Sequence, residues 1–164
     1  MKHFVPARVN DRFLITSIME REDPCDVFIS NSYKSIEEIS NGTIGSSSPR
    51  RQAMIKSLGK NINVIEMRGN INTRLKKLKN SNIDGIILAK AGLRRMEMDS
   101  LITQNLSVES FVPSPGQGVL CIECLSQHSE IMSKIKKVVH LNTEICVSAE
   151  RIFAAQMDGD CMSP

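Results

Sequence analysis

The chain alternates short apolar runs with segments in which apolar residues recur at helical spacing. Runs rich in β-branched and aromatic residues predict strands, and the amphipathic segments predict helices. The predicted strands are residues 13–18, 26–30, 43–45, 63–67, 84–88 and 119–123. The predicted helices are residues 35–39, 49–58, 71–79, 90–97, 129–139 and 143–157. Strands and helices follow one another between residues 26 and 97, which is typical of an α/β domain with a mainly parallel sheet.

The composition is that of a globular protein without a membrane span. Apolar residues make up 41% of the chain and charged residues 24%. No apolar run approaches the roughly 18 residues that cross a bilayer, and the first six residues lack the apolar region of a secretory signal. Five cysteines are an odd number, and only Cys121 and Cys124 are close together, so they fit a reducing compartment better than a disulfide framework. We therefore expect a cytoplasmic protein that is not bound to a membrane.

The positive charge of the chain is gathered in one block. Residues 44–95 hold twelve Lys and Arg against Glu66 and Asp84, whereas the segments before and after this block are acidic. Such a block predicts an anionic partner. The block contains no Phe, Tyr or Trp, which single-stranded nucleic acid would need for stacking, so a small anion is favoured over nucleic acid.

Two arginines lie in the first turn of a predicted helix. Ser48 is a good N-cap and Pro49 is suited to the first helical position, so the helix starts here and exposes its backbone N–H groups. Arg50 and Arg51 then add positive charge to the positive end of the helix dipole, at a cost of roughly 0.3–1 kcal/mol each. An anionic ligand or a nearby carboxylate would remove that cost.

Further arginines follow the next two predicted strands. Arg68 and Arg74 flank the turn after residues 63–67, and Arg95 follows the strand at residues 84–88. Ligands of open α/β sheets bind beyond the carboxyl ends of the strands. Arginine binds carboxylates through two parallel hydrogen bonds. Each arginine alone is typical of a solvated surface, but the set predicts one crevice for a polycarboxylate. Lys76, Lys77 and Lys79 are interpreted as a solvated helix face.

Several segments together resemble one enzyme family, porphobilinogen deaminase (hydroxymethylbilane synthase). The entry segment EREDP at residues 20–24 is similar to the start of that family's second domain. The other matching segments are IGSSSPRRQ (44–52), RGNINTRL (68–75), DGIILAKAGLRR (84–95) and GQG (116–118). They follow one another in the family's order and spacing, and the resemblance extends over essentially all of the chain.

The resemblance implies an α/β fold of the periplasmic-binding-protein-like kind, truncated at both ends. We expect a complete central βαβ domain with a mainly parallel sheet, flanked by fragments of two other domains. The expected segments are a fragment of the first domain (1–19), the central domain with the arginine-lined crevice (20–111), a return segment to the first domain (112–140) and the start of a third domain (141–164).

The resemblance also implies the residues of a site. In the family, arginines hold the acetate and propionate groups of a covalent dipyrromethane cofactor and of the growing pyrrole chain. The corresponding arginines are Arg50, Arg51, Arg68, Arg74 and Arg95, assisted by Ser46, Ser47, Ser48, Asn70 and Thr73. Cys161 corresponds to the cysteine that carries the cofactor through a thioether, although Asp160 replaces a family glycine before it. A thiolate is the nucleophile suited to such an attachment.

The implied reaction joins four porphobilinogen units into hydroxymethylbilane with release of ammonia, a step of haem biosynthesis. Lys2 matches the lysine of the family motif Lys-Asp-Val-Pro, but His3 or Phe4 stands where the catalytic aspartate is expected. That carboxylate stabilises cationic pyrrole intermediates, which a protonated histidine would repel. Two hypotheses stay open: a porphobilinogen deaminase, active or inactivated by truncation and by loss of the aspartate, and a non-catalytic carboxylate-binding α/β module.

The remaining expectations concern metals and partners. The pair Cys121-x-x-Cys124 has no second Cys/His pair at zinc-site spacing, so we interpret both cysteines as strand residues and expect no metal. By resemblance, the protein is a monomer whose partner is the small molecule porphobilinogen.

Overall fold

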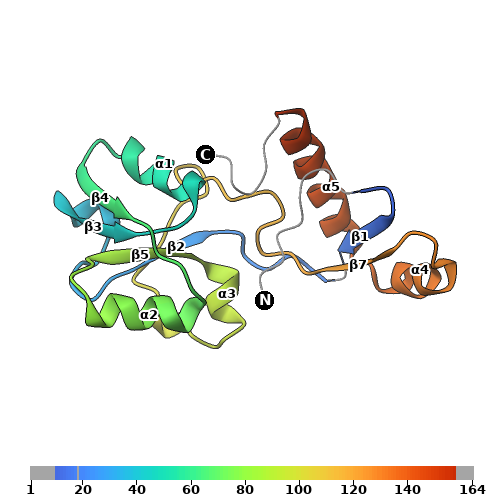
Figure 1. Ribbon diagram of the computed structural model, residues 1–164, viewed down its shortest axis with the longest axis horizontal. Helices are drawn as coiled ribbons and strands as arrows, with labels where there is room; N and C mark the ends of the chain where they lie inside the picture. Colours follow the sequence, from blue (N-terminus) through green and yellow to red (C-terminus); the bar gives the residue numbers. More distant parts are fainter. Residues whose placement is uncertain (1–9, 18, 158–164) are drawn as a thin grey trace. The chain divides into compact units, whose positions relative to one another are not determined.

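The computed structural model describes residues 10–17 and 19–157, which form two compact units. Unit 1 joins the described residues up to Glu22 to the segment from Ser114 onward, and unit 2 runs from Asp23 to Pro113 (Figure 1). Each unit is therefore built around its own strands. The finer division into residues 1–19, 112–140 and 141–164 stays a prediction.

Unit 2 is built on a five-stranded mixed sheet in the order β4-β3-β5-β2-β6. The strands are β2 (Asp26–Ile29), β3 (Asn41–Gly45), β4 (Asn61–Ile65), β5 (Gly85–Ala89) and β6 (Gln104–Asn105). Strand β3 pairs in parallel with β4 and β5, whereas β2 runs antiparallel to β5 and β6. The predicted α/β class is confirmed with a mixed sheet: β3 pairs in parallel as the βαβ rhythm predicts, whereas β2, which the same rhythm included, runs antiparallel.

Helices cover both faces of this sheet (Figure 1). The helices of unit 2 are α1 (Pro49–Ser57), α2 (Ile71–Asn80), α3 (Lys90–Arg94) and the short 3-10 helices η1 (Ile36–Glu38) and η2 (Asp99–Leu101). Ile55 of α1 joins Phe28 and Ile87 in one buried cluster. Leu78 of α2 and Leu93 of α3 join Val27 and Ile86 in the other. Strands β2 and β5 are buried on both faces, which explains their continuous apolar runs.

Both main helices of unit 2 begin at the caps that the sequence contains. Ser48 caps α1 by accepting a hydrogen bond from the backbone N–H of Arg51, and Pro49 is the first helical residue, as predicted. Asn70 caps α2 by accepting from the N–H of Thr73 at 2.9 Å. These caps fix where the chain turns from strand to helix, and so they fix the loops at the carboxyl edge of the sheet.

Several elements of unit 2 differ from the prediction. Strand β3 begins two residues before the predicted residue 43, and η2 was not predicted. Strand β4 lies two residues before the predicted 63–67. Met67 was assigned to the strand because it is apolar, but it follows the strand and packs in the same cluster as Leu78 of α2. Strand β6 was not predicted, since Gln104 and Asn105 are polar and form only a two-residue edge. Helix α3 ends before the predicted residue 97, where Glu97 takes the left-handed conformation (φ 55°) that stops a helix.

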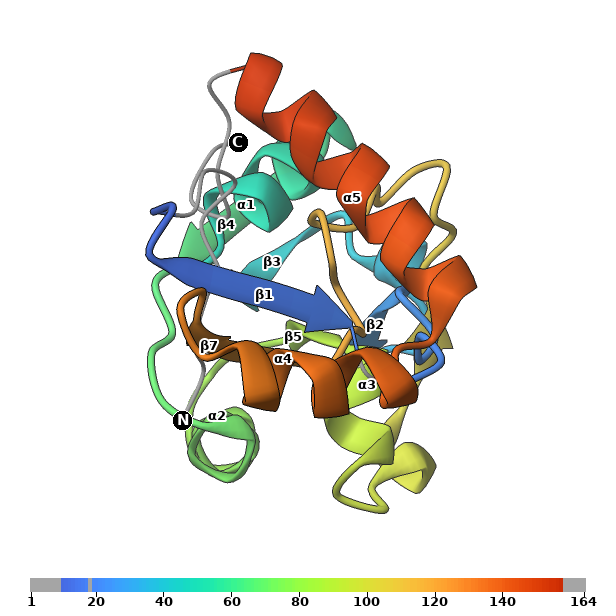
Figure 2. The same cartoon turned by 90° about the vertical axis from the view of Figure 1, so that its right-hand side faces the viewer.

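Unit 1 contains an antiparallel pair of strands with two helices, α5 contacting β1 and α4 contacting β7 (Figure 2). Its elements are β1 (Phe13–Ser17), β7 (Cys121–Leu125), α4 (Ser129–Ile135), the 3-10 helix η3 (Lys136–Val138) and α5 (Leu141–Gln156). Strand β7 starts two residues after the predicted residue 119. The reason is the preceding turn, in which Gly116 (φ 69°) and Gly118 (φ 87°) adopt a conformation that favours glycine.

Arg21 ties three segments of unit 1 together. Its guanidinium pairs with Glu150 of α5, and its Nε donates to the carbonyl of Gln117 at 3.0 Å. Its backbone N–H donates to the hydroxyl of Thr143 at 3.0 Å. Glu150 also accepts from the N–H of Gly116 at 2.8 Å. This network anchors α5 to Arg21 and to the turn at Gly116 and Gln117.

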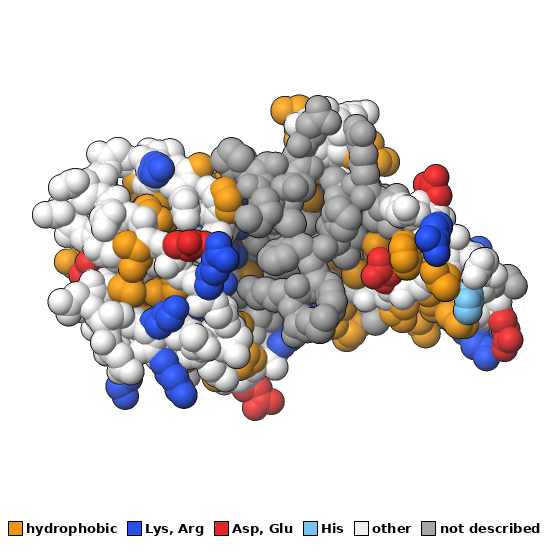
Figure 3. Space-filling model, in the orientation of Figure 1, with side chains coloured by type: hydrophobic (Ala, Val, Ile, Leu, Met, Phe, Trp, Pro, Cys, Tyr) orange, Lys and Arg blue, Asp and Glu red, His pale blue; other side chains and the backbone are white. Residues whose placement is uncertain are grey.

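The surfaces of the two units differ in character (Figure 3). In unit 2, Lys and Arg side chains gather over α2, where Lys76, Lys77 and Lys79 are exposed, as the interpretation of a solvated face predicts. In unit 1, large apolar side chains of α5 are exposed, among them Ile145 and Phe153. None of the helices in the described part of the chain is long and apolar enough to cross a membrane.

Another ion pair joins the segment before β2 to the first residue of α3. Lys90 Nζ lies 2.7 Å from Asp23 Oδ2, and the backbone N–H of Cys25 donates to Asp23 Oδ1 at 2.9 Å. Burial alone would raise the pKa of Asp23, but hydrogen bonds from Cys25 and Lys90 outweigh it and lower the pKa from 3.8 to about 2. The folded state therefore favours the charged carboxylate more than the unfolded state does.

The close packing of β2 against β5 predicts that Gly85→Ala destabilises unit 2. A Cβ at residue 85 would lie 2.6 Å from Phe28 Cζ and 3.2 Å from the carbonyl oxygen of Ile29, so the core must shift at a cost of about 1–3 kcal/mol. Urea unfolding followed by fluorescence of Tyr33 measures this cost in unit 2 alone, because the chain has one tyrosine and no tryptophan. Gly92→Ala in α3 is the matched control, since its Cβ would meet only the flexible end of Ile71. Equal stability of both variants would contradict the packing described.

The lowered pKa of Asp23 predicts a loss of unit 2 stability in acid. The stabilisation is complete above the unfolded pKa of 3.8 and is lost as the pH falls toward the folded value of about 2. Asp23→Asn should therefore flatten the dependence of unfolding free energy on pH in this window, measured by urea unfolding with Tyr33 fluorescence. Asp99→Asn removes an exposed carboxylate that lies 3.9 Å from Arg94 and should keep the wild-type slope. An unchanged slope in Asp23→Asn would show that Asp23 does not contribute.

Candidate functional site

The carboxyl edge of the parallel strands carries the candidate site. Strands β3, β4 and β5 end there at Gly45, Ile65 and Ala89, and the loops that follow lead into α1, α2 and α3. Strand β2 runs the opposite way, so its first residue, Asp26, lies at the same edge, opposite Ala89. An antiparallel strand thus brings an acidic side chain to an edge that the parallel strands supply with basic ones.

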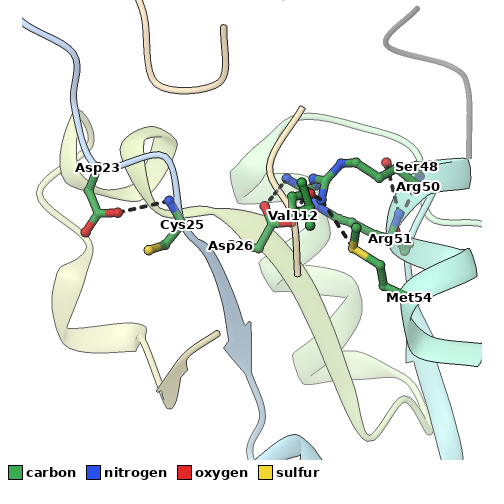
Figure 4. Close-up of polar contacts among 9 residues, drawn as sticks. Asp23, Cys25, Asp26, Ser48, Arg50, Arg51, Met54 and Val112 are labelled. Atoms are coloured by element: carbon green, nitrogen blue, oxygen red, sulfur yellow. Dashed lines mark hydrogen bonds and ion pairs between the residues drawn. The ribbon is translucent and has the colours of Figure 1, made fainter. Parts of the chain in front are cut away.

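Asp26 binds both arginines of the first turn of α1 (Figure 4). Its Oδ2 lies 2.7 Å from a terminal nitrogen of Arg50, and its Oδ1 lies 2.7 Å from a terminal nitrogen of Arg51. The carboxylate is fully buried, and the two arginine side chains are 10% and 9% exposed. The carboxylate that offsets the charges of Arg50 and Arg51 in the first turn of α1 is therefore Asp26, a residue of the protein itself.

Burial and the ion pairs shift the pKa values of Asp26 and Arg50. Burial would raise the pKa of Asp26, but the charges and hydrogen bonds of Arg51 and Arg50 outweigh it and lower the pKa. Burial also lowers the pKa of Arg50, which the charge of Asp26 partly counteracts. Arginine side chains nevertheless stay charged at neutral pH, so the buried carboxylate of Asp26 is bound by two cations.

Arg50 and Arg51 differ in their remaining contacts. Arg50 donates to the carbonyl of Val112 and lies 3.6 Å from the sulfur of Met54, so it is held from three sides. The Nε of Arg51 is buried and has no hydrogen-bond partner among the described residues. A buried N–H without a protein acceptor is rare in native proteins, and this nitrogen can donate to an oxygen of water or of a ligand.

Arg74 of α2 reaches the same place from the next loop. Its Nε donates to the carbonyl of Gly69 at 2.9 Å, and a terminal nitrogen lies 3.3 Å from the hydroxyl of Ser47. Burial, and then the positive charge of Arg51, lower the pKa of Arg74. The arginines of α1 and α2 are thus close enough to repel one another, which a bound anion would relieve.

The polar residues that were predicted to assist the arginines in binding also hold the loops of the site by hydrogen bonds. Ser46 is buried, donates its backbone N–H to Ile65 at 2.9 Å and accepts from the N–H of Ser48 at 3.3 Å. Ser48 caps α1, and Asn70 accepts from both the N–H and the hydroxyl of Thr73 at 2.9 Å. The loops that carry Arg51 and Arg74 are therefore held by these groups, and Ser47 touches an arginine of the site.

The structure does not bring every predicted residue into this cluster. The Arg68 side chain is 82% exposed, and its Nε lies 2.6 Å from Glu66. Arg95 is exposed and follows α3, a helix of five residues and so about 8 Å long, past the end of β5. Lys2, His3 and Cys161 lie outside the described residues. The roles assigned to all of these residues stay predictions.

Sequence reasoning missed Asp26, and a signal for it was present. It is the first residue of a strand whose other positions are buried and apolar. Charged residues are seldom fully buried unless they are paired. An acidic residue at the start of such a strand could have been matched to the arginines that the sequence places at the other strand ends.

The two neighbouring cysteines lie in β7. Cys121 and Cys124 are three positions apart in that strand, so their side chains point to opposite faces. Within residues 10–17 and 19–157, no group of three or more His, Cys, Asp or Glu side chains is arranged to hold a metal ion.

Solved structures resemble this chain at low sequence identity. A putative lipoprotein from Actinomyces odontolyticus is 15% identical, with a TM-score of 0.50 over 91% of this chain and 67% of that chain. A periplasmic binding protein from Salmonella typhimurium is 12% identical, with a TM-score of 0.48 over 91% of this chain and 65% of that one. At this identity, the first likeness concerns the α/β fold alone.

Sequence comparison gives a specific family. Residues 1–133 match the family model described as porphobilinogen deaminase, dipyromethane cofactor binding domain. Proteins named porphobilinogen deaminase from Clostridium botulinum (strain 657) and Francisella philomiragia are each 43% identical to the chain, over 160 and 159 residues. These matches cover 97% and 96% of the chain but 55% and 53% of the relatives, so the chain spans about half their length. The chain belongs to the porphobilinogen deaminase family.

Proposed function

We propose that the chain is the polycarboxylate-binding part of a porphobilinogen deaminase, the transferase that joins four porphobilinogen units into hydroxymethylbilane with release of ammonia. Family membership supports the reaction class. The observation that carries the proposal for this chain is that Arg74 contacts Ser47 at the carboxyl edge of the sheet and lies within electrostatic range of Arg51. Guanidinium groups in that arrangement suit the acetate and propionate groups of a pyrrole.

The dipyrromethane cofactor fits this donor set. Its side chains are carboxylates, and the buried Nε of Arg51 is a donor that still needs an acceptor. Arg51, Arg74 and Ser47 would hold the carboxylates, and Cys161 would carry the group through a thioether. When bound, the cofactor supplies the pyrrole end to which new units are joined.

The residues of the chain contribute binding and orientation. Arg51 is almost wholly buried and Arg74 partly so, and the weak screening of such sites strengthens their attraction for a carboxylate. Arg50 donates to Asp26 and to the carbonyl of Val112, and so holds the first turn of α1, which also carries Arg51. Proton handling falls to the segment of Lys2 and His3, for which the role remains a prediction. A monomeric state, a cytoplasmic location and porphobilinogen as the partner belong to the same proposal.

A second candidate is a non-catalytic module that binds a carboxylate without turning it over. The observation in its favour is that His3 or Phe4 stands where the family has its catalytic aspartate. Both candidates use the same arginines. They differ in whether Cys161 carries the cofactor and whether porphobilinogen is consumed.

Mass spectrometry of the chain incubated with porphobilinogen separates these candidates. The deaminase predicts a mass gain of one dipyrromethane, located on Cys161, together with consumption of porphobilinogen and release of ammonia. Cys161→Ser should abolish the gain, whereas Cys146→Ser, which changes an exposed cysteine of α5, should keep it. Porphobilinogen binding without an adduct or turnover would replace the transferase by the binding module.

A further inference from the structure

We propose that Asp26 is a positioning residue of the carboxylate site, acting on the ligand through Arg51. The proposal rests on the proposed function, because it concerns the same site. It adds an acidic residue, whereas the side chains expected to touch the ligand are basic or neutral. The grounds are the place of Asp26 in the sheet, its two ion pairs and the unpartnered nitrogen of Arg51.

Because β2 runs antiparallel to β5, Asp26 lies at the edge of the sheet where the arginine-bearing helices begin. The strand enters the sheet at the edge where β3, β4 and β5 leave it, and its first residue pairs with Ala89 at the end of β5. Asp26 is therefore fixed by backbone pairing in the middle of the sheet and is fully buried. A carboxylate held this rigidly defines the position of any guanidinium that binds it.

The pairing gives each guanidinium one oxygen of the same carboxylate. Because the oxygens bind Arg50 and Arg51 separately at 2.7 Å, Asp26 also sets the separation of the two side chains. The three groups together carry one positive charge. The site thus keeps an attraction for anions while two cations lie in the first turn of α1, where the helix dipole disfavours them.

Stability alone is a weak reason for this arrangement. A buried ion pair loses about as much free energy in desolvation as it gains in attraction, and apolar residues of similar volume often serve as well. Arg51 also leaves its Nε without a partner among the described residues, although a network evolved for stability would be expected to satisfy it. If Asp26 orients Arg51 so that its Nε can donate to a ligand oxygen, both the buried ion pairs and the nitrogen without a partner are explained.

Arg74 gives a second reason for a counter-charge beside Arg51. The charge of Arg51 lowers the pKa of Arg74, so the two cations lie within interaction range before any ligand binds. The negative charge of Asp26, which is bound to Arg51, offsets part of this repulsion. The two guanidiniums can then stay near one another and be ready for a shared carboxylate or for two neighbouring ones.

The test compares Arg50→Met with the double variant Asp26→Asn/Arg50→Met. The single variant keeps Asp26 on Arg51 and removes one positive charge, so the group of three becomes neutral. The double variant restores the charge of +1 but deprives Arg51 of its carboxylate. Calorimetric titration with porphobilinogen measures affinity in each, and Tyr33 fluorescence confirms that unit 2 is folded. Neither variant leaves two buried guanidiniums without a counter-ion.

Positioning and simple charge predict opposite results. If Asp26 positions Arg51, the double variant binds porphobilinogen roughly tenfold more weakly than Arg50→Met, about the value of one charge-assisted hydrogen bond. If Asp26 only tunes the charge, the double variant binds more tightly, and the proposal is overturned.

A measurement without ligand separates this proposal from the proposed function. In ¹H–¹⁵N spectra, the Nε–H of Arg51 should exchange with solvent faster in the double variant than in Arg50→Met. Equal exchange rates would refute positioning even if porphobilinogen binds. Faster exchange in a chain that binds no porphobilinogen would refute the proposed function and leave the positioning of Arg51 by Asp26 standing.

Discussion

The burial of one carboxylate between two guanidiniums is the constraint on which the candidate site depends. Asp26 can occupy that place only because β2 runs antiparallel to β5, which puts the first residue of β2 at the carboxyl edge of the parallel strands. Once it is there, α1 can begin with two arginines beside the positive end of its dipole. The mixed topology of the sheet and the chemistry of its edge are therefore linked.

Unit 2 holds this edge rigidly by ordinary packing. Apolar clusters lie on both faces of the sheet, and caps at Ser48 and Asn70 fix where the two arginine-bearing loops become helices. Unit 1 is built differently, with two strands and a helix, α5, that exposes large apolar side chains such as Phe153. The features that point to carboxylate binding in the described residues belong to unit 2.

Much of this fold could be predicted from the sequence, because local signals determined it. Caps, prolines and buried apolar runs placed the helices and central strands within a few residues. Strand β6 and the shift of β4 were missed, since pairing of polar residues and packing of Met67 are decided by tertiary contacts. The positions of Arg51 and Arg74 followed from the rule for strand ends. The exposure of Arg68 and the role of Asp26 did not, because a sequence does not show which cation a carboxylate will meet.

The central claim is that the arginines of α1 and α2 form one site for a carboxylate. The most direct test is the affinity for porphobilinogen of Arg74→Gln compared with Lys76→Gln. Both remove one positive charge from α2, but only Arg74 contacts Ser47 and lies within interaction range of Arg51. The account predicts that Arg74→Gln weakens binding by roughly tenfold or more and that Lys76→Gln leaves it nearly unchanged. Equal effects of the two substitutions would mean that the basic block attracts anions without a defined site.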